Sequence, residues 1–166
     1  MCTAVTYNTD CENYFGRTLD YEFSYGEEIV IMPRNFKIKL GGREYDSHYA
    51  IIGMAHTADG YPLFYDALNE KGLAMAGLNF VGNAVYNKPV ENRENVAQYE
   101  FIPRILAACS TVREAVDTIK NINITDEAFS DSLPAANLHW MIADKDSAVT
   151  VESTKDGVKI YDNRVG

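Results

Sequence analysis

The sequence of 166 residues has little positive charge, few cysteines and no long hydrophobic run. Its 15 Lys and Arg stand against 24 Asp and Glu, a net charge of -9 at pH 7, so it offers no basic surface to a nucleic-acid backbone. No apolar run reaches the roughly 18 residues that span a bilayer, and the N-terminus has no signal-peptide pattern. We therefore expect no nucleic-acid partner, no membrane segment and a cytoplasmic location.

The three cysteines, Cys2, Cys11 and Cys109, are an odd number and form no Cys-x-x-Cys pair. This pattern predicts neither a disulfide framework nor a zinc site. The histidines also lack the spacing of metal ligands. We therefore expect no metal ion and no cofactor.

Short runs rich in β-branched and aromatic residues predict strands in the first half of the chain, at 3–7, 14–17, 28–32, 36–40, 48–54 and 72–80. We expect the first two to form a hairpin at the N-terminus and the next two to pair. Segment 56–65 is interpreted as a loop. These elements make the first half strand-rich.

The periodicity of the second half is first that of helices and then again that of strands. Thr111 and Glu114 have the spacing of a capping box and predict a helix through Ile119. A helical stripe over about 95–109 should be kinked or interrupted by Pro103. Strands return at 138–143, 148–152 and 158–161. Strands segregated from two helices predict an α+β fold, a layered sandwich with antiparallel sheet, and no linker divides 1–166, so we expect a single domain.

The first candidate for chemistry is Cys2, which follows the initiator Met1. A small residue at position 2 allows Met1 to be removed, which leaves Cys2 with a free α-amine. Thiols and α-amines both titrate near neutral pH, so the amine can take the thiol proton and pass it to a leaving amine. The alternative is that Cys2 is only a small residue at an N-terminus.

Arg17 and Asp20 lie on and just after the expected return strand of the N-terminal hairpin, which brings them back toward Cys2. A guanidinium can stabilise a thiolate, and a carboxylate can orient the α-ammonium, as in catalytic triads built from other groups. The alternative is a weak surface ion pair between two residues three positions apart.

Six segments in order along the chain resemble the choloylglycine hydrolases, the family of N-terminal-nucleophile hydrolases that contains bile salt hydrolases and penicillin V acylases. They are Met1 to Thr3, Phe15 to Asp20, Met32 to Phe36, Asn69 to Leu73, Ala76 to Phe80 and Leu138 to Ile142. The resemblance implies a four-layer αββα sandwich in which Cys2 is the nucleophile, with Arg17 and Asp20 beside the thiol. It also implies that Asn79 helps form the oxyanion hole, where bile salt hydrolases have Asn and penicillin V acylases typically have Tyr.

Members of this family continue beyond the position of Gly166, so we expect a sandwich truncated to about half. A second oxyanion-hole Asn and a further active-site Arg of the family fall outside this chain. Segments 21–27, 56–65 and 128–137 correspond to loops that surround the apolar part of the substrate in the family. The alternative is that their aromatic residues only pack on the domain.

The resemblance predicts hydrolysis of the amide bond of glycine- or taurine-conjugated bile acids through a thioester on Cys2, without a cofactor. One alternative is an acylase acting on penicillin V or another N-acyl amide. Another is an inactive fragment that serves as a binding or assembly module. The expected partners are a small-molecule substrate and either further copies of the chain or a complementing C-terminal half.

Overall fold

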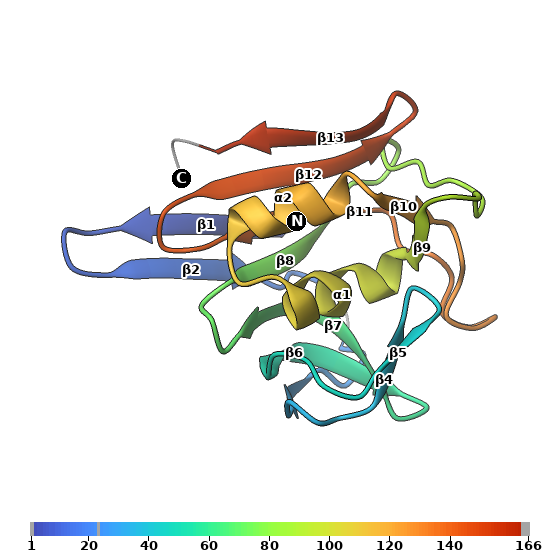
Figure 1. Cartoon of the computed structure of the whole chain (residues 1–166), viewed down its shortest axis with the longest axis horizontal. Coiled ribbons are helices and arrows are strands. Elements are labelled where there is room, and N and C mark those ends of the chain that lie inside the picture. The colour runs from blue at the N-terminus through green and yellow to red at the C-terminus, as the bar shows by residue number, and fades with distance from the viewer. Residues whose placement is uncertain (1, 23, 164–166) are drawn as a thin grey trace.

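The computed structural model describes residues 2–22 and 24–163, which form layers around one large sheet (Figure 1). The strands of this sheet are β3 (Glu28–Met32), β6 (Ile51–Ala58), β7 (Tyr61–Asn69), β8 (Ala74–Asn79), β11 (Leu138–Ala143), β12 (Ala148–Thr154) and β13 (Gly157–Asp162). Their order across the sheet is β13-β12-β11-β8-β7-β6-β3, and each neighbouring pair is antiparallel. This arrangement confirms the predicted antiparallel sheet.

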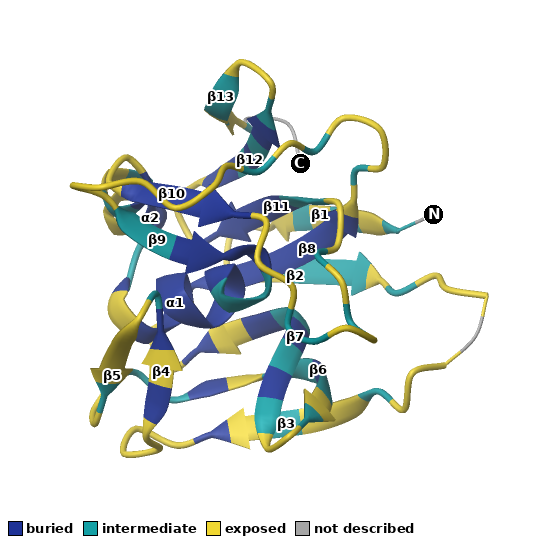
Figure 2. Cartoon of the chain, turned by 90° about the vertical axis from the view of Figure 1, so that its right-hand side faces the viewer, coloured by how far each residue is buried: buried dark blue, intermediate teal, exposed yellow. Residues whose placement is uncertain are grey.

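The two faces of the sheet are covered by different elements (Figure 2). Helices α1 (Phe101–Ala108) and α2 (Val112–Ile119) lie on one face, and the hairpin of β1 (Thr3–Asn8) and β2 (Asn13–Thr18) lies on the other. Both the N-terminal hairpin and the α+β layered fold were predicted from the sequence. Among the described residues, no helix is long and apolar enough to cross a membrane.

Side chains of the central strands alternate between these two layers, as the period of a strand requires. Met75 and Ile142 point into the main core beneath the helices and are completely buried. Their neighbours Ala76 and Met141 join a smaller cluster, against which Phe15 of the hairpin packs. The hairpin is thus fixed to the middle of the sheet through small side chains.

Helix α2 begins as the sequence predicts, because the Thr111 side chain accepts a hydrogen bond from the Glu114 amide at 3.2 Å. Helix α1 does not begin near residue 95: Glu94–Ala97 forms strand β9, which pairs in parallel with β10 (Ile122–Thr125), and the single 3-10 turn η1 (Gln98–Glu100) follows. Pro103 therefore lies in the first turn of α1, where its missing N–H leaves no helical hydrogen bond unmade. The predicted kink or interruption at Pro103 is wrong for this reason.

Two predictions about the early strands are also wrong. Strand β3 pairs with β6, while β4 (Ile38–Leu40) pairs with β5 (Arg43–Tyr45) in a separate hairpin. Segment 56–65 is not a loop but the turn end of the β6–β7 hairpin, with the adjoining parts of both strands. Both hairpins turn through two residues with positive φ, Gly41-Gly42 and Asp59-Gly60, which is the geometry of tight two-residue turns.

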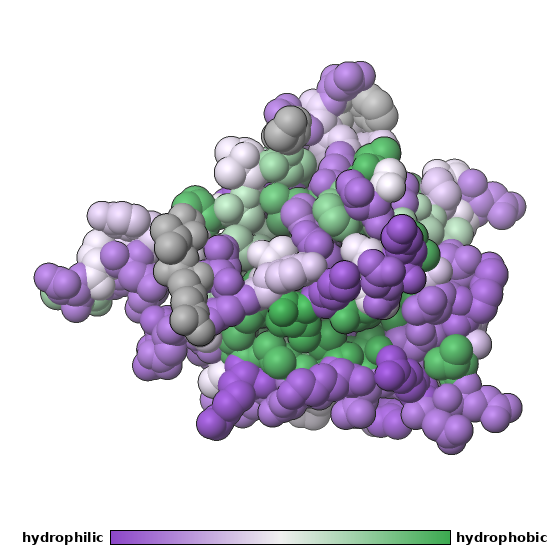
Figure 3. Space-filling model, turned by 90° about the horizontal axis from the view of Figure 1, so that it is seen from above, coloured by the Kyte–Doolittle hydropathy of each residue, from purple (hydrophilic) through white to green (hydrophobic). Residues whose placement is uncertain are grey.

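The hairpin face of the sheet is only partly covered. Ile31, Ile52 and Leu68 are successive cross-strand partners on β3, β6 and β7, and we call them the apolar row. Their exposed fractions are 67%, 39% and 48%. Figure 3 looks at the molecule from the side on which β13 lies. In this view too, a group of apolar residues (green) is exposed between bands of polar residues (purple).

Candidate active site

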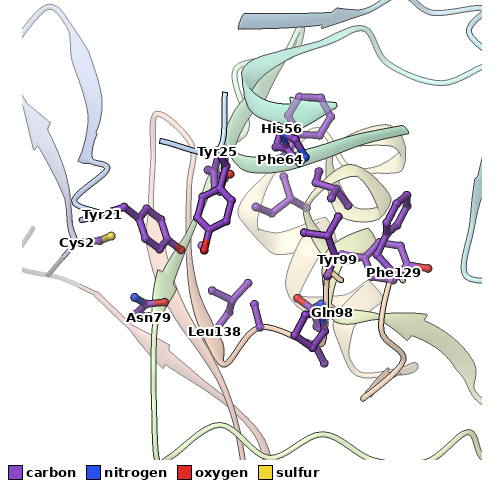
Figure 4. Close-up of a pocket in the computed structure, with 18 of the residues that line it drawn as sticks. Cys2, Tyr21, Tyr25, His56, Phe64, Asn79, Gln98, Tyr99, Phe129 and Leu138 are labelled. Carbon is purple, nitrogen blue, oxygen red and sulfur yellow. The ribbon is translucent and has the colours of Figure 1, made fainter. Parts of the chain in front are cut away.

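A pocket of about 300 Å³ lies where the hairpin, the large sheet and segment 129–136 meet. Its walls are mainly apolar and aromatic, with a few polar side chains. Figure 4 shows its two ends, formed by Cys2, Tyr21 and Asn79 on one side and by Gln98, Tyr99 and Phe129 on the other. A mainly apolar pocket with few polar groups is typical of a small-molecule site.

Cys2 is brought to this pocket by the hairpin. It directly precedes β1, is half-buried and packs against the cluster that contains Leu78. In the register of the hairpin, Ala4 of β1 pairs with Arg17 of β2, so the return strand carries Arg17 to the same end of the pocket. The sequence-based expectation that these two residues lie together agrees with this placement.

The Arg17 side chain is held rigidly, with only 7% of it exposed. Its Nη2 donates to the carbonyl oxygen of Gly77 at 2.7 Å, and its Nε lies 3.2 Å from the Asp66 carboxylate. The Nη1 group is buried without a hydrogen-bond partner in the described part of the chain. A buried donor of this kind is costly unless a ligand or water satisfies it. Arg17 thus brings a positive charge to the pocket lining and keeps one donor unsatisfied.

Asp66 is a residue that the sequence analysis missed. Burial raises the pKa of Asp66 above its ordinary value, and the neighbouring Arg17 guanidinium only partly offsets this effect. The amide of Met54 also donates to its carboxylate. The one local signal was an acidic residue within the apolar strand sequence Tyr61–Asn69.

Asn79 is the last residue of β8, and its side chain lines the pocket at the Cys2 end (Figure 4). The next residue, Phe80, donates its amide to the carbonyl of Asn137 at 2.8 Å, which fixes this end of the strand beside β11. An amide side chain next to a thiol can donate to an oxyanion that forms during acyl transfer.

Asp20 is placed differently from the other three predicted residues. It is exposed, lies beyond the end of β2 and does not line the pocket. The structure therefore brings Cys2, Arg17 and Asn79 to one pocket and leaves Asp20 outside its lining.

A β-bulge shapes the aromatic wall. The β6–β7 register shifts between Met54 and Ala55, so Tyr65 is an extra residue opposite them. As a result the three consecutive residues Leu63, Phe64 and Tyr65 all line the pocket, which a regular strand would not allow.

The phenol groups of this wall are held in a partly desolvated environment. Burial raises the pKa of Tyr65 to about 12. The pKa of Tyr21 is also raised, first by burial and then by electrostatic interaction with the nearby Cys2. The Tyr21 ring lies 5.8 Å from that of Tyr25 and 6.2 Å from that of Tyr65, measured between centroids. The hydroxyls of Tyr21 and Tyr65 therefore stay protonated and can donate hydrogen bonds at neutral pH.

All three segments predicted to surround a substrate contribute to the pocket. Segment 21–27 supplies Tyr21 and Tyr25, segment 56–65 supplies the bulged strand, and segment 128–137 supplies Phe129 and the wall at 132–136. Over residues 2–22 and 24–163, no group of three or more His, Cys, Asp or Glu is placed to hold a metal ion.

Residues 2–166 match the linear amide C-N hydrolases, choloylglycine hydrolase family. The chain belongs to this family. It is 48% identical over 167 residues to a bile salt hydrolase/transferase of Lactiplantibacillus plantarum and 40% identical over 171 residues to one of Clostridium perfringens. Both matches cover 100% of this chain but only 51% and 52% of the relatives. The chain thus spans about half the length of the curated relatives it matches.

Solved structures show the same fold. A conjugated bile acid hydrolase variant from Clostridium perfringens superimposes with a TM-score of 0.93 at 38% identity, over 100% of this chain and 52% of that one. Penicillin V acylase from Agrobacterium tumefaciens gives a TM-score of 0.78 at 18% identity, over 98% of this chain and 49% of that one, and so shares the fold. The N-terminal-nucleophile hydrolase fold expected from the sequence is confirmed.

Proposed function

We propose that this chain carries the nucleophile and the acyl pocket of an amidase that hydrolyses glycine- or taurine-conjugated bile acids. The observation that carries the proposal is a single pocket lined by Cys2, Arg17 and Asn79. Cys2 and Asn79 lie at one end of it, and Tyr99 and Phe129 lie at the other (Figure 4). Relatives that match the whole chain are named bile salt hydrolase/transferase. A rigid apolar acyl group suits the aromatic end, and its amide then reaches the cysteine.

The proposed reaction uses Cys2 as nucleophile and its α-amine as base, once Met1 has been removed. The amine takes the thiol proton, and the thiolate forms a C–S bond to the amide carbonyl carbon. Asn79 donates to the resulting oxyanion, while Arg17 stabilises the thiolate. The C–N bond then breaks as the amine returns the proton to the leaving glycine or taurine. Water cleaves the thioester and releases the bile acid.

The alternative substrate is penicillin V or another N-acyl amide. Asn79 supports the bile salt assignment, because the resemblance places Asn there in bile salt hydrolases and Tyr in penicillin V acylases. Replacing Asn79 with Tyr should shift the ratio of the two activities toward penicillin V. An unchanged ratio would show that this residue does not select the substrate.

The direct experiment measures release of free glycine or taurine from conjugated bile salts by the chain with Met1 removed. We expect release that disappears in Cys2→Ala and persists in Cys11→Ala, a matched control at the exposed tip of the hairpin. Equal release from the Cys2→Ala variant would contradict the proposed nucleophile.

The apolar row supports a second candidate, in which the chain acts as an assembly module or needs a partner for activity. Isoleucine and leucine side chains this exposed, side by side on one sheet face, are typical of a surface that is covered in an assembly. The partner would be a second copy or a chain equivalent to the remaining half of the relatives. Sedimentation of the purified chain over a range of concentrations tests the first form. A chain that stays monomeric would exclude self-association through this face.

A further inference from the structure

Segment 129–138 forms one wall of the pocket and contains almost no regular structure. Its lining residues include Phe129, Leu133, Ala136 and Leu138. Within the segment, Phe129 and Leu133 are joined by a hydrogen bond of 3.1 Å between amide and carbonyl. Where the segment returns into β11, the Asn137 carbonyl accepts from the Phe80 amide at 2.8 Å. Its neighbours Ala136 and Leu138 have a second anchor, which matters because a loop lining a pocket has few ladder hydrogen bonds of its own.

That anchor is the hydroxyl of Tyr86. It accepts a hydrogen bond from the Leu138 amide at 2.8 Å and donates to the Ala136 carbonyl at 2.8 Å. The ring is half-buried and its centroid lies 6.3 Å from that of Trp140, a completely buried residue that also lines the pocket. Burial raises the pKa of Tyr86 to about 12, so the hydroxyl keeps its proton at neutral pH.

Tyr86 is itself fixed on both sides. The preceding residue, Val85, donates its amide to the Ser153 carbonyl at 2.9 Å and accepts from the buried Ser153 hydroxyl at 2.7 Å. The following residue, Asn87, donates to the Ile124 carbonyl at 3.0 Å and forms a β-bridge with Thr125. The segment that carries Tyr86 is therefore hydrogen-bonded to both β12 and β10. Through its hydroxyl, Tyr86 links the pocket wall at Ala136 and Leu138 to these two strands.

We propose that Tyr86 is a positioning residue that sets the shape of the pocket wall between its two ends by holding Ala136 and Leu138 in place (Figure 4). Tyr86 does not line the pocket, so its effect on the substrate is indirect. This inference rests on the proposed function, because it assigns the pocket to a bulky acyl group. Loss of the hydroxyl leaves an amide and a carbonyl of the wall without a partner, and the wall must then move to find water.

The experiment compares Tyr86→Phe with Tyr161→Phe, a control on β13 that is 47% exposed. Three measurements are needed. The first is hydrogen exchange of the Leu138 amide, the second is the affinity for an unconjugated bile acid, measured by the change in Trp140 fluorescence, and the third is the steady-state kinetics of hydrolysis. The sequence contains one tryptophan, so this fluorescence reports on the pocket alone. Kinetics would use a glycine-conjugated bile acid and a short-chain N-acyl glycine.

We expect Leu138 exchange to accelerate and the Kd and KM for the bulky acyl group to rise by about five- to tenfold in Tyr86→Phe, the effect of one lost neutral hydrogen bond. The kcat for the bulky substrate, all constants for the short acyl group and the Tyr161→Phe variant should stay near wild type. A merely structural role would lower activity on both substrates equally and would overturn the proposal, as would unchanged Leu138 exchange or unchanged Kd.

Failure of the proposed function would look different. A wild-type chain that neither binds nor hydrolyses bile acids would contradict that function. Exchange at Leu138 and quenching of Trp140 by acrylamide need no substrate, and they would still decide whether Tyr86 holds the wall. Faster exchange and stronger quenching in Tyr86→Phe would support that role, and unchanged values would exclude it.

Discussion

The two faces of the large sheet are built in contrasting ways. On the helix face, Met75, Trp140 and Ile142 are completely buried beneath α1 and α2. On the hairpin face, small residues such as Ala76 meet the two strands of the hairpin, and Ile31 of the apolar row is mostly exposed. The helix face has the dense packing of a protein core, whereas the hairpin face is only partly covered and has few buried large side chains.

The candidate nucleophile comes from the lightly covered side. Cys2 and Arg17 belong to the hairpin layer, while Phe64 and Trp140 of the pocket belong to the main core. The pocket thus joins a rigid wall to a layer with few buried contacts. Stability should therefore depend mainly on the helix face and chemistry on the hairpin face. Substitutions on the two faces should have different effects on the free energy of unfolding and on activity.

The largest expected effect separates the faces by stability. Ile142→Ala removes a completely buried side chain from the helix face and should lower the free energy of unfolding by about 3 kcal/mol. The same substitution at Ile31, 67% exposed on the other face, should change it by less than about 0.5 kcal/mol. Urea unfolding of both variants measures the two free energies. Equal losses of stability would contradict the proposed difference between the two faces.

A smaller loss is expected where the strands of the pocket wall approach each other. A Cβ at Gly53 would lie 2.2 Å from the Asp66 carbonyl oxygen and 2.5 Å from the Ala67 Cβ. Gly53→Ala should therefore cost about 2 kcal/mol and displace the backbone that carries Asp66 and Tyr65.

The matched control for Gly53 is Gly16→Ala in the hairpin, where the nearest atom lies 3.8 Å from the added Cβ. That variant should remain within about 0.5 kcal/mol of wild type in the same thermal or urea unfolding experiment. Two variants of equal stability would mean that the bulge region is as tolerant as the hairpin layer.

The hairpin face can be tested for association. Ile31→Lys places a charge in the apolar row and should weaken self-association by roughly tenfold, the effect of losing one buried isoleucine contact. Val81→Lys, at a position 72% exposed and outside the row, is the control and should change association little. Sedimentation velocity over a concentration series gives the answer. If both lysine substitutions changed self-association equally, the apolar row would not be part of the interface.

The smallest expected effect lies at the β3 side of the sheet. Glu70 accepts two hydrogen bonds of 2.8 Å from Arg34 Nε and one of 2.9 Å from the Ala50 amide, and these contacts lower its pKa to about 2. A carboxyl with a lowered pKa stabilises the fold at neutral pH, and this contribution is lost as the pH falls toward about 2.

Glu70→Gln should therefore have a slightly lower Tm than wild type at pH 7, and the difference should vanish near pH 2. The exposed Glu91→Gln serves as control and should show no such dependence. A difference that grows on acidification would have the wrong sign and would contradict the assigned ion pair.

Local signals in the sequence predicted the elements that depend on neighbouring residues. The N-terminal hairpin, helix α2 with its Thr111 cap and the three last strands all follow from short-range patterns. The resemblance added Asn79, which the structure places in the pocket with Cys2 and Arg17. Their predicted catalytic roles stay predictions.

The remaining features depend on contacts between distant parts of the chain. Strand β9 is stabilised by parallel pairing with β10, and the apolar stripe of 95–109 gave no sign of that partner. Asp66 meets Arg17 only because a bulge and two sheet layers bring them together. Two hairpins, β4–β5 and β6–β7, were not predicted although the sequence contains an indication of each. Their turns are formed by Gly41-Gly42 and Asp59-Gly60, and such residue pairs favour tight turns.

The central claim is that Cys2 forms the acyl-enzyme in this pocket. The most direct measurement is intact mass spectrometry, followed by peptide mapping, of the chain quenched in acid during exposure to a glycine-conjugated bile acid. We predict a mass increase equal to the bile acid acyl group, located on Cys2 and absent from Cys2→Ala. An adduct on Cys11 or Cys109, or no adduct while glycine is released, would contradict the account.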